Sequence, residues 1–133
     1  MCGIVGYVGG RRAAPILLEG LRRLEYRGYD SAGLAICDSP LGIHKQVGRV
    51  ADLASVVPED TPGSVGVAHT RWATHGGVTV ENAHPHVDTD QRVGVVHNGI
   101  IENATALRKR LVAEGVVFRS ETDTEVLAHL ISM

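Results

Sequence analysis

Two of the stretches that could do chemistry lie at the start and the middle of the chain. Cys2 directly follows Met1, and removal of that methionine would place a thiol and a free α-amine on one residue. An α-amine with a pKa of about 7.7–8 is partly neutral at pH 7 and accepts a proton. A nucleophile activated by a terminal amine is a known scheme. The alternative is that Cys2 is a small buried apolar residue at the start of a strand.

The second stretch runs from Arg71 to Gly76 and reads RWATHG. Arginine grips a carboxylate with two parallel hydrogen bonds. Thr74 and His75 add short polar groups, and Gly76 lets the backbone approach a ligand closely. The stretch suits a binding loop and a solvated loop around a packed tryptophan equally well, and the residues alone leave both open.

Two shorter features are ambiguous by themselves. Asn98-Gly99 ends an apolar run and is typical of a turn. It could also form an oxyanion hole, with the Asn98 amide and the Gly99 N–H as donors. Asp123 could hold a ligand ammonium, or it could simply occupy the first turn of a helix, where the dipole favours an acid. The residues alone leave both alternatives open.

The histidines could in principle bind a metal. His84-Pro85-His86 is the closest pair, but it lacks the helical i, i+4 spacing of HExxH, and no cysteine pair accompanies it. The glycines near the N-terminus do not make a GxGxxG fingerprint. We therefore expect no metal site and no cofactor.

Composition limits the class of protein. The chain has 133 residues, which fits one domain, with 44% hydrophobic and 21% charged residues and a net charge of −2. No basic stripe suits nucleic acid, and no apolar run approaches the roughly 20 residues of a membrane span. There is no secretory signal, and the two cysteines make no disulfide framework. We therefore expect a soluble, cytoplasmic protein with no nucleic-acid or membrane partner.

Short strands and helices must position these groups. The hydrophobic pattern and the Gly and Pro positions predict strands at 2–8, 33–37, 42–47, 65–69, 92–97 and 116–120. They predict helices at 13–25, 50–57 and 103–114, and a last helix that begins with a capping box from Thr122 to Glu125. Leu17, Leu21 and Leu24 should form the apolar face of the first helix. The absence of a βαβ rhythm indicates an α+β fold.

Taken together, these features resemble the class II glutamine amidotransferases, whose glutaminase domains are N-terminal nucleophile hydrolases. The opening MCGIVG is similar to the start of that family. The resemblance continues through LRRLEYRGYDSAG (21–33), AHTRWATHG (68–76), NAHPH (82–86), VHNGIIEN (96–103) and SETDTEV (120–126). It implies an αββα sandwich of antiparallel sheets.

The resemblance also implies roles, position by position. Cys2 would be the nucleophile and its own α-amine the general base, while Asn98 and Gly99 would form the oxyanion hole. Arg71 would bind the α-carboxylate of L-glutamine and Asp123 its α-ammonium, and Thr74 and His75 would line the same pocket. Arg27 would support the nucleophile loop.

The implied reaction is hydrolysis of the glutamine side-chain amide through a thioester, which supplies ammonia for the amination of fructose 6-phosphate. The acceptor would be bound by sugar isomerase domains outside these 133 residues. The last helix is uncapped at Met133, so we expect residues 1–133 to be a partial glutaminase domain, incomplete at its C-terminus. Exposed sheet edges favour a homo-oligomer. The rival interpretation is a non-catalytic fragment that binds glutamine or serves in assembly.

Overall fold

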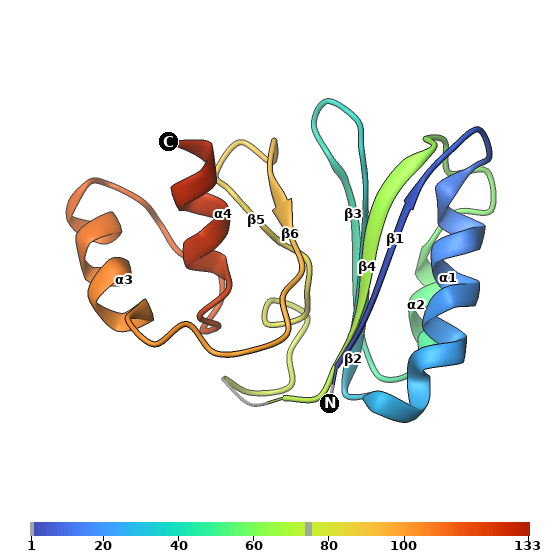
Figure 1. Ribbon diagram of the computed structural model, residues 1–133, viewed down its shortest axis with the longest axis horizontal. Helices are drawn as coiled ribbons and strands as arrows, with labels where there is room; N and C mark the ends of the chain where they lie inside the picture. Colours follow the sequence, from blue (N-terminus) through green and yellow to red (C-terminus); the bar gives the residue numbers. More distant parts are fainter. Residues whose placement is uncertain (1, 74–75) are drawn as a thin grey trace.

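The computed structural model describes residues 2–73 and 76–133. Helices α1 and α2 cover the outer face of a four-stranded sheet, and a small second sheet faces the other side, with α4 and then α3 beyond it (Figure 1). This order of helix, sheet, sheet and helix is the predicted αββα arrangement. The described helices include none that is long and apolar enough to cross a membrane.

The main sheet is antiparallel throughout, in the order β1-β4-β2-β3. Its strands are β1 (Gly3–Val8), β2 (Ser31–Ile36), β3 (Gly42–Val47) and β4 (Val65–Arg71). The four strands predicted here are confirmed, with small shifts at the ends. β4 continues two residues past the predicted end at His69, because Thr70 and Arg71 pair with β1 and β2 rather than joining the loop.

The two helices on the outer face close the main core. The apolar face predicted for α1 (Ala13–Leu24) is confirmed, since Leu17 and Leu21 are fully buried. Leu24 packs over Gly3, where an added Cβ would come within 2.8 Å of the Leu24 Cβ. A short 3-10 helix, η1 (Glu25–Arg27), follows α1. Helix α2 (Val50–Val56) packs beside α1. The start of β1 is thereby held against a helix.

The second layer contains β5 (His86–Val87), β6 (Gly94–Val95), α3 (Ala104–Ala113) and α4 (Glu125–Ser132). The strand predicted at 92–97 is shorter than expected, because the Asp88 carboxylate accepts the N–H groups of Arg92 and Val93 in a turn. α3 is confirmed within one residue at each end.

Contacts at Gly33 and Lys45 help to attach the second layer to the first. The backbone of the second layer lies directly on β2 at Gly33, where a Cβ would clash with the carbonyl oxygen of His84. Lys45, on β3, donates its ammonium to the carbonyl oxygens of Glu81 (3.1 Å) and Pro85 (3.5 Å). Burial lowers the pKa of Lys45 to about 8. These contacts set the position of the histidine-bearing segment 84–86.

The strand predicted at 116–120 is wrong: these residues are irregular. The N–H of Val116 bonds back to Leu111, and the N–H groups of Arg119 and Ser120 donate to the Glu125 carboxylate. Local acceptors therefore use the donors that a strand would need.

Those same contacts overturn the capping box predicted for α4. The carboxylate of Glu125 accepts the hydroxyl and the N–H of Ser120 instead of the N–H of Thr122. The residue that precedes the helix is Thr124, and its side chain makes no capping hydrogen bond. Cys37, predicted to lie inside a strand, follows β2 and is exposed.

Candidate functional site

Cys2 lies just before β1, at the end of the sheet where β4 finishes. Its sulfur accepts the backbone N–H of Trp72 at 3.2 Å and lies 3.6 Å from the Trp72 carbonyl oxygen. The pairing of β1 with β4 creates this contact, because Gly3 is registered with Thr70 and also donates to its hydroxyl. A residue at the chain start is thus placed by sheet pairing and not left to fray.

Asn98 and Gly99 approach Cys2 from the other layer. The amide nitrogen of Asn98 donates to the Cys2 carbonyl oxygen at 3.1 Å, although the two residues are 96 positions apart. Gly99 has φ of +142°, a conformation that L side chains rarely adopt. The structure therefore brings Asn98, one of the two predicted oxyanion donors, to the predicted nucleophile, and Gly99 is the next residue in the chain.

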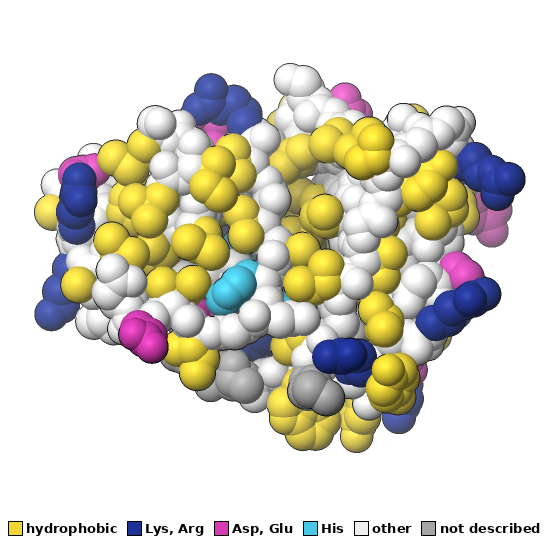
Figure 2. Space-filling model, viewed as in Figure 1, with side chains coloured by type: hydrophobic (Ala, Val, Ile, Leu, Met, Phe, Trp, Pro, Cys, Tyr) yellow, Lys and Arg dark blue, Asp and Glu magenta, His cyan; other side chains and the backbone are white. Residues whose placement is uncertain are grey.

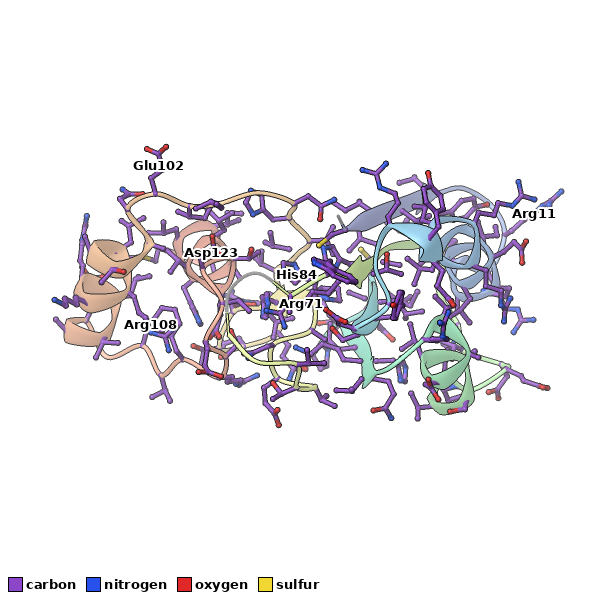
Figure 3. The ribbon with its side chains drawn as sticks, turned by 90° about the horizontal axis from the view of Figure 1, so that it is seen from below. Arg11, Arg71, His84, Glu102, Arg108 and Asp123 are labelled. Carbon is purple, nitrogen blue, oxygen red and sulfur yellow. The ribbon has the colours of Figure 1, made fainter. Side chains whose placement is uncertain are left out.

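Arg71 lies between the two layers, and Asp123 lies in the second layer just before α4. Figure 3 shows Arg71 near His84 at the middle of the molecule, with Asp123 on the side of α4. The Arg71 guanidinium is buried and donates to the Gly77 carbonyl oxygen at 2.8 Å. Burial lowers the pKa of Arg71, and the charges of Cys2, Asp30 and Asp123 oppose that shift. Asp123 accepts the Ile101 N–H at 2.7 Å, which holds the segment after Gly99.

The other predicted site residues have different outcomes. Arg27 ends the short turn η1 after α1 and is half-buried. Thr74 and His75 lie outside the described residues, so their predicted place in the pocket stays a prediction.

Asp30 is a residue that the sequence did not single out. Its carboxylate accepts the Ala73 N–H at 2.9 Å, and its own N–H donates to the Arg71 carbonyl oxygen at 3.0 Å. These two bonds hold the backbone of 71–73, and with it the Trp72 N–H that contacts the cysteine sulfur. No local pattern marks this role, since Asp30 sits in a loop 41 residues before Arg71.

A buried group of histidines lies beside these residues. His69 stacks on His84 with ring centres 4.0 Å apart, and His86 packs edge-on to His84 at 4.6 Å. Burial lowers the pKa of His69 to about 4 and that of His86 to about 3, and it lowers the pKa of His84 further still. These rings are therefore neutral at physiological pH.

The histidines connect the segment around Asn98 to the segment around Asp123. His84 accepts the His97 N–H at 3.4 Å, and the His97 ring lies 3.3 Å from the Thr124 hydroxyl. His86 lies 2.7 Å from the Thr122 hydroxyl. Within the part of the chain that the structure describes, no group of three or more His, Cys, Asp or Glu side chains is arranged to hold a metal ion.

This arrangement fits acyl transfer. The Asn98 amide reaches the backbone of Cys2, the predicted nucleophile, and Gly99 follows Asn98 directly, so an oxyanion formed at Cys2 could be met by donors from this segment. A buried cation and a buried carboxylate at the same interface suit a zwitterionic substrate. The residue types at this site are those that acyl transfer by a cysteine would need.

Comparison with known proteins points the same way. The glutamine amidotransferase domain model matches residues 43–133. The chain is 53% identical to a glutamine–fructose-6-phosphate aminotransferase (isomerizing) from Methanosarcina mazei, over 98% of the chain and 22% of the relative. It is 58% identical to the enzyme of the same name from Symbiobacterium thermophilum, over 99% of the chain and 22% of the relative. The chain thus spans about a fifth of these relatives.

Solved structures share its fold. The glutamine phosphoribosylpyrophosphate amidotransferase of B. subtilis superposes with a TM-score of 0.81 at 31% identity, over 99% of this chain and 29% of that one. A structure described as the allosteric regulatory enzyme of purine biosynthesis superposes with a TM-score of 0.82 at 33% identity, over 99% of this chain and 29% of that one. The predicted α+β fold of the N-terminal nucleophile hydrolase type is confirmed. The chain belongs to the glutamine amidotransferase family.

Proposed function

We propose that this chain hydrolyses the side-chain amide of L-glutamine with Cys2 as the nucleophile. The observation that carries the proposal is the meeting of Cys2 and Asn98 across the two layers, through the 3.1 Å bond from the Asn98 amide to the Cys2 carbonyl oxygen. Relatives named as glutamine–fructose-6-phosphate aminotransferases match nearly the whole chain and support glutamine as the substrate.

The proposed reaction has two stages. The Cys2 sulfur attacks the amide carbon of glutamine, and the thiol proton passes to the α-amine that removal of Met1 exposes. The carbon–nitrogen bond breaks, the proton goes to the departing ammonia, and a γ-glutamyl thioester remains. Water then attacks the thioester, releases glutamate and restores the thiol. Asn98 and Gly99 stabilise the oxyanion formed in each stage.

The substrate is oriented by groups at the same interface. Arg71 binds the α-carboxylate and Asp123 the α-ammonium, while Thr74 and His75 line the pocket and Arg27 supports the nucleophile loop. The buried position of Arg71, whose pKa is influenced by the charges of both Cys2 and Asp123, supports this placement.

The wider context is proposed from the relatives. Residues 1–133 would form part of a glutaminase domain, and segments outside them would use the ammonia to aminate fructose 6-phosphate. The two free cysteines suit a reducing cytoplasm. We also propose a homo-oligomer, because β1 and β3 are the edge strands of the main sheet.

The test is glutamate release from glutamine by the chain and by two cysteine variants. Cys2→Ala should abolish release, whereas Cys37→Ala should leave it unchanged, because Cys37 is an exposed thiol away from the site. Mass spectrometry of the same sample establishes whether Met1 is present. Full activity in Cys2→Ala would refute the nucleophile, and full activity with Met1 retained would refute the α-amine as base. A wild-type chain that binds glutamine without releasing glutamate would favour the non-catalytic interpretation.

A further inference from the structure

His69 is a buried residue to which the proposed mechanism assigns no role. It lies on β4, the strand between β1 and β2, and is fully buried. Its Nε2 lies 2.9 Å from Oδ1 of Asn98. Asn98 itself is exposed and belongs to no helix or strand. A rigid buried ring therefore contacts the side chain of an exposed residue that has to be well oriented for catalysis.

The contacts define the direction of this hydrogen bond. The other end of the Asn98 amide faces the Cys2 carbonyl oxygen, which can only accept, so that end must be the NH₂ group. The end that faces His69 is consequently the amide oxygen, which can only accept. The proton of the neutral His69 ring must therefore lie on Nε2, and His69 is the donor.

The surroundings of His69 keep this geometry fixed. Its ring stacks on His84 at an angle of 13°. Burial is the main cause that lowers its pKa to about 4, so the ring carries one proton at neutral pH and donates from one nitrogen. The stacked neighbour His84 also accepts the N–H of His97, the residue before Asn98.

We propose that His69 is a positioning residue for catalysis: by donating from Nε2 to Oδ1 of Asn98, it keeps the Asn98 NH₂ group on the side that faces Cys2, where it can donate to the oxyanion formed on glutamine. This inference rests on the proposed function, because it assigns His69 a role through the oxyanion donor. Without His69 the amide group of Asn98 could rotate about the Cβ–Cγ bond. It would then present its oxygen, which cannot donate, to the developing oxyanion. The effect should fall on the transition state more than on substrate binding.

The first experiment measures glutamine hydrolysis by variants. His69→Phe keeps a stacking ring but removes the donor, and it should lower kcat about 10- to 100-fold with little change in KM, less than the roughly 10²–10³-fold loss of an oxyanion donor itself. His69→Gln places an amide donor near the former Nε2 and should recover much of the rate. His44→Phe, a change on strand β3, is the matched control and should retain full activity.

A double-variant comparison separates positioning from a general loss of structure. If His69 acts through Asn98, then His69→Phe combined with Asn98→Ala should be no slower than Asn98→Ala alone. Additive losses would overturn the proposal, as would a lowered melting temperature that accounts for the whole loss in His69→Phe.

Nitrogen-15 NMR of the unmodified protein gives a readout that does not depend on activity. The ring of His69 should be neutral at pH 7 with its proton on Nε2. A proton on Nδ1, or a charged ring, would overturn the proposal. A wild-type chain that releases no glutamate would refute the proposed function. The position of the ring proton would even then show whether His69 donates to Asn98.

Discussion

At the scale of single residues, the site is made by side chains that are far apart in sequence and individually ambiguous. Cys2, Arg71 and Asn98 each have an ordinary structural explanation when considered alone. The contacts of Cys2 with Trp72 and of Asn98 with Cys2 show that these distant segments meet in the fold, although an ordinary turn at Asn98-Gly99 would not need to face Cys2.

Arg71 gives the prediction that belongs to this scale. Arg71→Lys keeps a positive charge but loses the planar fork that grips a carboxylate. We expect KM for glutamine to rise about 10- to 100-fold, which corresponds to losing a charged hydrogen bond of roughly 1.5–3 kcal/mol. Steady-state kinetics measure it, with Arg23→Lys on the exposed surface of α1 as the control. An unchanged KM would exclude Arg71 from the carboxylate site.

At the scale of elements, the two layers are assembled around a few backbone contacts. Gly33 on β2 lets the main chain at His84 lie directly on the sheet, and Lys45 on β3 holds the carbonyl oxygens of the same segment. This segment carries the histidines that contact the Asn98 region. Sheet packing and site geometry therefore depend on the same few residues.

Gly33→Ala should disrupt this contact. The added methyl group would meet the His84 carbonyl oxygen, a backbone atom that cannot swing aside. We expect the free energy of unfolding to fall by about 1–3 kcal/mol, as in other overpacked interiors. Denaturant unfolding measures the loss. Gly6→Ala on β1 is the matched control, because a Cβ there meets nothing within 4 Å. Equal stabilities of the two variants would contradict this account of the interface.

At the scale of the whole molecule, the space between the layers is only partly apolar. A groove of about 470 Å³ lies between the main sheet and β6, lined by side chains such as Val67, Leu41 and Val93. Figure 2 shows apolar side chains gathered on both halves of one face, with a histidine visible between them. Beside this apolar groove, the buried histidine group, Lys45 and Arg71 form the polar part of the interface.

This distribution predicts how stability depends on pH. The pKa values of His69 and His86 are about 4 and 3 in the folded chain, and that of His84 is lower still, against an ordinary value of about 6.5. The unfolded chain therefore binds more protons below pH 6.5, and stability falls as pH decreases from about 6.5 toward 4. Each ring lowers the free energy of unfolding by up to about 1.4 kcal/mol for each pH unit of acidification. Lys45 and Arg71 act in the same direction, since both lower the pKa values of His84 and His86.

Urea unfolding at several values between pH 4.5 and 8 checks this expectation. His84→Phe removes one group that takes up a proton on unfolding. The slope of the free energy of unfolding against pH should therefore decrease by the amount that corresponds to about one proton. A stability that stays level between pH 6.5 and 5 would mean that the histidines are not buried as described.

The sequence by itself determined the strands and helices with strong periodicity, such as the Leu17 and Leu21 face of α1, because local spacing decides which face is buried. It also identified Cys2, Arg71, Asn98 and Asp123 as candidates, since the functional group of each side chain follows directly from the residue type. It failed at 116–120 and at the capping box, where Glu125 binds the backbone of Arg119 and Ser120 instead.

Tertiary structure alone decided the contacts of Asp30 with Ala73 and of His69 with Asn98, and the placement of Asn98 against Cys2. These contacts join residues separated by 29 to 96 positions. No local pattern specifies which atoms meet after two layers pack, because hydrogen-bond direction depends on the relative placement of whole elements. The candidate residues of the site could therefore be named from the sequence, whereas how their side chains are oriented required the fold.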